Sequence, residues 1–166
     1  DSEGYDETHN NTNSSTIKIY LDDWYKNNIE SKNLSGYISD TLFCNDRTLV
    51  TGSGVGTIET IYKGYYGPWS DNFLYRTVQL KCNQQNDRFT TDDESIGNGD
   101  LTYPIGLITK DESILAGGYN LNNNNFFLFT GNAFWTMTSH SFNATYASMS
   151  KIYSSGSADS SDSVNN

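Results

Sequence analysis

The sequence predicts an α+β domain with two short helices, an irregular twisted antiparallel sheet and long loops. Three observations lead to this prediction. Apolar and aromatic residues recur at near-helical spacing after Ser14 and Ser15. Thr109 and Glu112 have the spacing of a capping box, which marks the start of a helix. Short runs of aromatic and β-branched residues fill the second half of the chain, as is typical of strands.

The first helix is predicted over residues 15–28, with Ser14 or Ser15 as the N-cap. Its apolar positions form a stripe with aromatic residues on the flanks: Ile17, Tyr20, Leu21, Trp24, Tyr25 and Ile29. Because an amphipathic helix normally buries such a stripe, we expect these side chains in the core rather than at a ligand site.

The second helix begins after Thr109 and stops at Gly117-Gly118, since glycine readily ends a helix. Strands are predicted over residues 73–80, 126–129, 133–137 and 145–153. Trp135 falls in the third of these strands, and we expect its side chain to point into the core.

A length of 166 residues suits one domain. We expect an acidic lead-in over residues 1–14, a single domain over 15–155 and a polar tail over 156–166. The tail is rich in Ser, Asp and Gly and would be disordered if taken alone, or would lead toward a missing closing strand.

The charge of the chain argues against several classes of partner. A net charge of −10 with no run of Lys or Arg repels phosphate backbones, so nucleic acid is not an expected partner. No apolar run approaches the ~18 residues of a membrane-spanning helix, so we expect no membrane insertion by this segment. The surface is solvated by Ser, Thr and Asn more than by charged residues, which is common in extracellular proteins.

The two cysteines, Cys44 and Cys82, are either joined by one disulfide or are two reduced, buried thiols. The extracellular composition favours the disulfide. Asn45-Asp46-Arg47 follows Cys44 directly, and Asn86-Asp87-Arg88 follows Cys82 closely. For both repeats we expect local ion pairs and Asx turns.

The second half resembles the C-type-lectin-like fold of bacterial surface proteins, including the lectin-like relatives of formylglycine-generating enzymes. Leu107-Ile108-Thr109 with Glu112 matches the helix start of that fold, and Phe134-Trp135-Thr136-Met137-Thr138 matches the strand that follows. Residues 15–155 as a whole resemble an uncharacterised domain that is repeated in large secreted or wall-linked proteins of gut bacteria. The matching segments are Leu21-Asp22-Asp23-Trp24-Tyr25, Phe43-Cys44-Asn45-Asp46-Arg47, Tyr103-Pro104-Ile105-Gly106-Leu107-Ile108-Thr109, Ala116-Gly117-Gly118 and Phe134-Trp135-Thr136-Met137.

The resemblance implies an adhesin-like module on a bacterial cell surface, with a host or microbial glycan or protein as its ligand. Function in such folds lies in the loops. Aromatic rings and amides suit the recognition of such ligands, and the candidate residues are Tyr65, Tyr66, Trp69, Asn122, Asn123 and Asn124. The alternative is a structural spacer that has no ligand and buries its aromatic residues.

Neither catalysis nor a cofactor is expected. A nucleophile needs a base and an orienting acid nearby, whereas His9 lies in the lead-in and His140 stands apart from any such group in the sequence. Calcium is the one metal that the sequence suggests. An acidic loop over residues 90–100 offers oxygen ligands from Asp92, Asp93 and Asp100. That loop lacks EF-hand spacing, and the calcium-sugar motifs of animal lectins are absent from the sequence.

Overall fold

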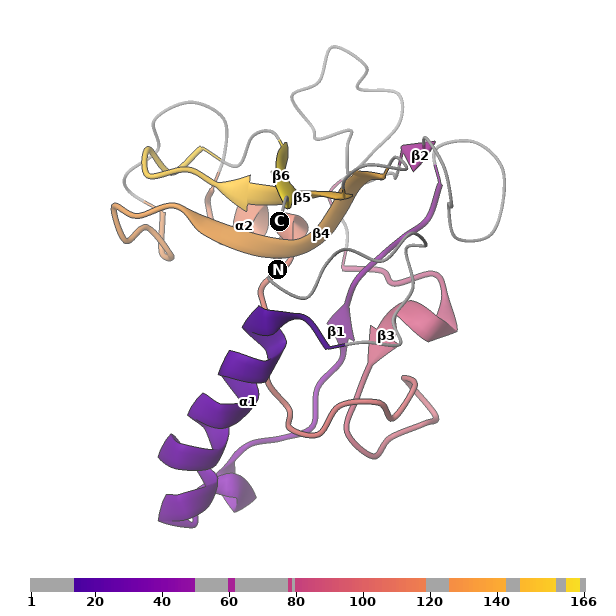
Figure 1. Cartoon of the computed structure of the whole chain (residues 1–166), viewed down its shortest axis with the longest axis vertical. Helices are drawn as coiled ribbons and strands as arrows, with labels where there is room; N and C mark the ends of the chain where they lie inside the picture. The colour runs from indigo at the N-terminus through magenta and orange to yellow at the C-terminus, as the bar shows by residue number, and fades with distance from the viewer. Residues whose placement is uncertain are drawn as a thin grey trace.

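The computed structural model describes residues 14–49, 60–61, 78, 80–118, 126–142, 147–157 and 161–164. Within these residues, helices combine with antiparallel strands, which confirms the α+β class (Figure 1). One sheet has the strand order β2-β4-β5-β6, and a second sheet pairs β1 with β3. The elements are α1 (Thr16–Asn28), η1 (Glu30–Lys32), η2 (Ser35–Tyr37), β1 (Phe43–Cys44), β2 (Thr60–Ile61), η4 (Gln85–Asp87), β3 (Arg88–Phe89), α2 (Lys110–Leu115), β4 (Phe134–Phe142), β5 (Ala147–Ile152) and β6 (Ser161–Val164).

Helix α1 confirms the predicted first helix and its cap. The Ser15 Oγ accepts a hydrogen bond of 3.3 Å from the Lys18 backbone N–H, which satisfies one of the unpaired donors at the helix start. The Ile29 N–H closes the last turn on the Tyr25 carbonyl at 2.8 Å. The buried Tyr25 ring stacks on the Tyr103 ring, with the ring centroids 4.9 Å apart, and this contact anchors α1 to the rest of the chain.

Helix α2 confirms the predicted capping box. The Glu112 N–H donates to the Thr109 Oγ1 at 3.1 Å, and the Thr109 N–H donates to the Glu112 Oε2 at 2.7 Å. The helix ends where the two glycines were expected to stop it. Gly117 has φ of +101°, a conformation that favours glycine, and the Gly118 N–H donates to the Ser113 carbonyl at 2.9 Å.

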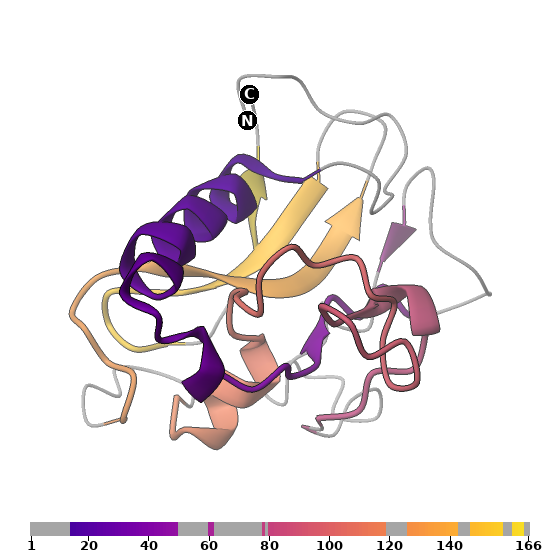
Figure 2. The ribbon, with the colours of Figure 1, turned by 90° about the horizontal axis from the view of Figure 1, so that it is seen from below.

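The long strands β4 and β5 form the centre of the four-stranded sheet. β4 extends beyond the predicted residues 133–137, whereas β5 falls inside the predicted 145–153. Figure 2 shows α1 and α2 on opposite sides of these strands, and α2 packs against both of them. On the α2 side, Ile114, Phe126 and Ile152 form a buried apolar cluster.

The prediction of a strand over residues 126–129 is wrong. The Phe129 N–H donates to the Phe126 carbonyl at 3.0 Å, which closes a turn. Phe126 enters the apolar cluster, and Phe129 meets it edge to face with ring centroids 6.2 Å apart. The aromatic run therefore forms a tight turn despite its high strand propensity, with Phe126 buried and Phe127 88% exposed.

Part of the polar tail over residues 156–166 is a strand, although its composition taken alone predicts disorder. Strand β6 pairs with β5, and Met149 lies opposite Asp162 in the register. A ladder of backbone hydrogen bonds needs no apolar side chains, so a segment rich in Ser and Asp can pair with the edge of β5.

The predicted strand over 73–80 lies largely outside the described residues. None of the helices in the described ranges has the length and apolar character needed to cross a membrane.

Candidate functional site

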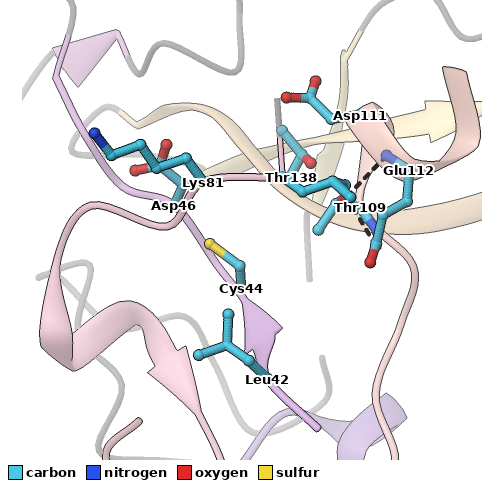
Figure 3. A pocket seen from close by; sticks show the side chains of 9 residues that line it. Leu42, Cys44, Asp46, Lys81, Thr109, Asp111, Glu112 and Thr138 are labelled. Atoms are coloured by element: carbon cyan, nitrogen blue, oxygen red, sulfur yellow. Dashed lines mark hydrogen bonds between the residues drawn. The ribbon is translucent and has the colours of Figure 1, made fainter. Parts of the chain in front are cut away.

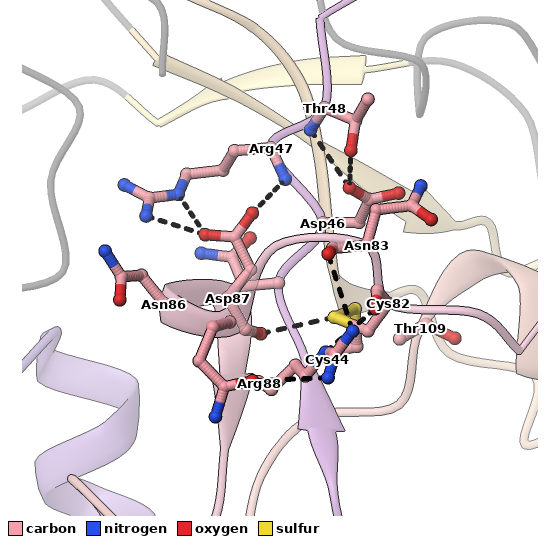
Figure 4. Close-up of a disulfide and its surroundings, with 12 residues drawn as sticks. Cys44, Asp46, Arg47, Thr48, Cys82, Asn83, Asn86, Asp87, Arg88 and Thr109 are labelled. Carbon is pink, nitrogen blue, oxygen red and sulfur yellow. Dashed lines mark hydrogen bonds and ion pairs between the residues drawn. A yellow bond between two sulfur atoms is a disulfide. The ribbon is translucent and has the colours of Figure 1, made fainter. Parts of the chain in front are cut away.

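Cys44 and Cys82 form the predicted disulfide, with their Cα atoms 5.9 Å apart (Figure 4). Cys44 ends β1, and Cys82 lies shortly before η4 and β3, so the bond joins the two chain segments that make the small sheet. A bridge across 38 residues contributes about 4 kcal/mol in the chain-entropy account of disulfides.

Beside the disulfide, Arg47 and Asp87 form a buried ion pair. The Asp87 Oδ1 accepts from the Arg47 Nε at 2.7 Å and lies 2.6 Å from its terminal nitrogen, and Oδ2 accepts from the Arg47 backbone N–H at 2.8 Å. The predicted local ion pairs are therefore wrong here, because the arginine of the first Asn-Asp-Arg repeat pairs with the aspartate of the second. The predicted Asx turn is confirmed at Asp46, whose Oδ1 accepts from the Thr48 N–H at 3.0 Å.

The other members of the two repeats extend this network. The Asn45 N–H donates to the Asp87 carbonyl at 3.0 Å, while its side-chain oxygen accepts from Ser139 of β4 at 2.8 Å. The Arg88 Nε donates to the Cys82 carbonyl at 2.9 Å. We call Asn45, Arg47, Asp87, Arg88 and the disulfide the disulfide cluster. Its charged groups hold together the segments that form the small sheet, and Asn45 joins them to β4, which is a structural role.

A small pocket lies between the disulfide cluster and the start of α2 (Figure 3). Its volume is about 50 Å³, which holds a few water molecules but not a sugar ring. Glu112 is already used in the capping box. The residues that line it are Leu42, Cys44, Asp46, Leu80, Lys81, Thr109, Asp111, Glu112 and Thr138.

The acidic loop is organised around the Asp40 carboxylate. The Asp40 carboxylate accepts the backbone N–H groups of Thr91 at 3.0 Å, Asp92 at 3.2 Å and Asp93 at 3.4 Å. Burial acts to raise the pKa of Asp40, but these hydrogen bonds outweigh it and hold that pKa below its ordinary value of 3.8.

The carboxylates proposed for calcium are not gathered into one set of ligands. Asp93 accepts from the Ser95 N–H at 2.9 Å, and the Asp100 N–H donates to the Asn98 side chain at 3.1 Å. Within the described ranges, no three His, Cys, Asp or Glu side chains are placed to hold a metal ion. Calcium binding through Asp92, Asp93 and Asp100 stays a prediction.

The predicted ligand residues Tyr65, Tyr66, Trp69, Asn122, Asn123 and Asn124 lie outside the described residues, as does His9. Their role stays a prediction. The other histidine, His140, is buried in β4, and its Nδ1 lies 3.1 Å from the Ser141 Oγ.

Helix α1 exposes much of the stripe that was expected in the core. Ile17, Tyr20 and Trp24 are spaced along one face of the helix, and they are 40%, 66% and 44% exposed. Tyr25 points elsewhere on the helix and makes the buried contact, so the stripe is wider than the surface that covers it. Figure 1 shows α1, in indigo, extending away from the four-stranded sheet. The sequence carried a signal of this, since apolar residues occupy more of the helix than one core-facing stripe requires.

Further exposed rings lie on other elements. Tyr37, at the end of η2, is 85% exposed. Trp135 was expected in the core but is 36% exposed, because the buried neighbours Thr136 and Thr138 take the positions of β4 that face inward. Lys151 lies opposite Trp135 in the β4–β5 register. Its Nζ lies 5.8 Å from the Trp135 ring centroid and 4.8 Å from that of Tyr153.

No protein-family model, curated protein sequence or solved structure matches this chain.

Proposed function

We propose that this domain is a non-enzymatic, glycan-binding module of an extracellular bacterial surface protein. One observation carries the proposal: large aromatic side chains are exposed to solvent on three different elements. They are Tyr20 and Trp24 on α1, Tyr37 at the end of η2 and Trp135 on β4. Aromatic rings in such positions offer flat apolar faces on which the C–H face of a pyranose ring packs, while the Tyr and Trp polar atoms remain available for hydrogen bonds.

The exposed rings favour binding over the spacer alternative. A spacer with no ligand gains nothing from exposed Trp and Tyr, whose burial would stabilise the fold by roughly 1.5–3 kcal/mol for each large apolar side chain. The disulfide between Cys44 and Cys82 supports an extracellular location, because such bonds persist in oxidising compartments.

The proposal includes the C-type-lectin-like fold suggested by the resemblance. Two features support it: a capped helix, α2, precedes an aromatic strand, β4, and that strand is central to an antiparallel sheet. The helix α1 at the other end of the domain matches the first of the two expected helices.

A protein ligand is the second candidate, and the face of α1 favours it. Ile17, Tyr20 and Trp24 combine an aliphatic side chain with two aromatic ones at helical spacing. Tyr and Trp are enriched among the residues that dominate protein–protein binding energies.

The test is a glycan array and a mucin-binding assay with the oxidised domain, with calcium and again with a chelator. We expect selective binding that falls at least about tenfold in Trp24→Ser or Trp135→Ser. The control Phe127→Ser, which removes an exposed ring from the turn at residues 126–129, should leave binding unchanged. Equal binding by all variants, or no binding at all, would overturn the proposal. Mucin binding that survives enzymatic removal of the glycans would replace the glycan with a protein ligand. Loss of binding with the chelator would support the calcium loop.

A further inference from the structure

We propose that the solvent-facing side of α1 binds an amino sugar, a hexosamine unit whose amine is a free ammonium group rather than an acetamide. This inference rests on the proposed glycan-binding function and names the class of sugar that one surface recognises. Four residues carry it, and we call them the Asp23 face: Tyr20, Asp23, Trp24 and Asn27.

The geometry of the helix places these four side chains next to one another. Residues three, four and seven positions apart share one face of an α-helix, and the other three residues follow Tyr20 by these intervals. All four are exposed, with Tyr20 at 66% and Trp24 at 44%. The buried residue of α1, Tyr25, points toward the rest of the domain, and the helix lies along the outside of the molecule (Figure 1). The Asp23 face is therefore open to a ligand.

The polar groups of the Asp23 face are available for binding. Within the part of the chain that the structure describes, the Asp23 carboxylate and the Asn27 side-chain amide make no ion pair or hydrogen bond. Lys18 is paired with Asp22 near the opposite side of the helix. Lys26, the other lysine of α1, forms no ion pair with Asp23. The Asp23 face thus presents a carboxylate without a counter-charge beside two exposed aromatic rings.

The charge of this surface is complementary to a cationic sugar. An ammonium group is attracted by the Asp23 carboxylate and also by the faces of the Tyr20 and Trp24 rings, which carry negative partial charge. The net charge of −10 adds long-range attraction for cations and repels uronates, sialates and sulfated sugars. A neutral sugar would leave the Asp23 carboxylate unpaired.

The remaining groups suit the sugar ring itself. The C–H face of a pyranose packs on an aromatic ring, and Tyr20 and Trp24 offer two such rings one helical turn apart. The Asn27 amide has both a donor and an acceptor for hydroxyl groups. A glycan that contains glucosamine units therefore uses every group of the Asp23 face, whereas a basic peptide would use the charge but not the sugar contacts.

The experiment compares three probes in NMR titrations of the oxidised chain at about pH 6, where amines are protonated and Asp23 is ionised. A chitosan tetramer, which carries an ammonium group on each sugar, is paired with the N-acetylated chitin tetramer, and tetralysine supplies ammonium groups without a pyranose. We expect the chitosan tetramer to bind about fivefold or more tightly than the chitin tetramer. This preference should shrink in about 1 M salt, and tetralysine should bind more weakly than the chitosan tetramer.

Variants locate the effect on α1. Asp23→Asn should remove the preference for the chitosan tetramer. Asp92→Asn is the matched control, because it removes the same unit of charge from an exposed position in the acidic loop and should leave the preference unchanged. Trp24→Ser should weaken the binding of both tetramers. Backbone chemical shifts outside α1 check that each variant is folded.

Three results would overturn the amino-sugar assignment. They are equal affinities for the two tetramers, a preference that survives in Asp23→Asn, and tetralysine binding as tight as that of the chitosan tetramer. In each case, a glycan whose binding is lost in Trp24→Ser leaves the proposed function standing. Failure of every array glycan and of both tetramers removes the proposed function as well.

Discussion

Arg47 and Asp87 form an almost fully buried ion pair although 40 positions separate them in the chain. The side chains are 4% and 0% exposed, and both Asp87 oxygens accept hydrogen bonds from Arg47. The pair joins the two Asn-Asp-Arg repeats, so a pattern that is local in the sequence becomes a long-range contact in the fold.

Removing one partner of this pair should destabilise the domain strongly. Asp87→Asn removes the buried carboxylate that pairs with the Arg47 guanidinium, and we expect the free energy of unfolding to fall by about 3–5 kcal/mol. Urea unfolding measured by circular dichroism checks the value. The matched control is Asp22→Asn, which breaks the i,i+4 pair with Lys18 on α1 and should cost no more than about 0.5 kcal/mol. Similar losses in both variants would mean that the buried Arg47–Asp87 pair contributes no more to the free energy of unfolding than an exposed pair does.

The disulfide should add to the stability of the same region. Cys44→Ser combined with Cys82→Ser should lower the free energy of unfolding by about 4 kcal/mol, because the unfolded chain is no longer closed across 38 residues. Thermal unfolding of the double variant, compared with that of the wild type with and without reductant, measures this. Reductant should affect the wild type alone. A double variant as stable as the oxidised protein would contradict the prediction.

Two neighbouring aromatic residues of α1 should differ sharply in their contribution to folding. Tyr25→Ala removes a buried ring that stacks on Tyr103 and should cost about 3 kcal/mol or more. Trp24→Ala truncates a side chain that is 44% exposed, and we expect a loss of about 1 kcal/mol or less. Chemical denaturation of the two variants side by side makes the comparison. If the costs are equal, α1 is covered on both faces.

The hydrogen bonds that the acidic loop donates to Asp40 should weaken when the Asp40 carboxylate is protonated, and the domain should lose stability. The pKa of Asp40 is lower in the folded protein than its ordinary value of 3.8, so its contribution to stability is complete above that value. The contribution is lost as the pH falls through the lower pKa of the folded state, where the carboxyl group becomes neutral in both states.

Asp40→Asn should therefore be less stable than the wild type at about pH 7 and pH 5, and the difference should shrink below about pH 4. Urea midpoints over this pH range give the curve, and Asp23→Asn, which changes an exposed carboxylate of α1, is the control. A difference that does not depend on pH would show that the backbone hydrogen bonds do not favour the ionised form of Asp40.

Local signals in the sequence predicted the helix boundaries well. Ser15 and the Thr109–Glu112 pair determine their helix starts through hydrogen bonds that span three residues, so the chain segment itself contains the needed information. The disulfide was equally accessible, because two cysteines allow a single intramolecular pairing.

Contacts that depend on the whole fold were not predictable in the same way. Arg47 has a nearer acidic neighbour in Asp46, and only the pairing of β1 with β3 brings Asp87 to it. Strand β6 has few apolar residues, and its order comes from the edge of β5. For Ile17, Tyr20 and Trp24, helical periodicity showed which residues share a face but not whether another element covers that face.

The disulfide also determines how the domain would respond to mechanical pulling. In a surface protein under shear, tension applied to the two ends of this chain passes from Cys44 directly to Cys82 through the covalent bond. The intervening segment carries no load, and about 130 Å of extensible length is withheld while the bond is intact. Force spectroscopy under reducing conditions should recover that length, so oxidation makes this chain shorter and stiffer under load.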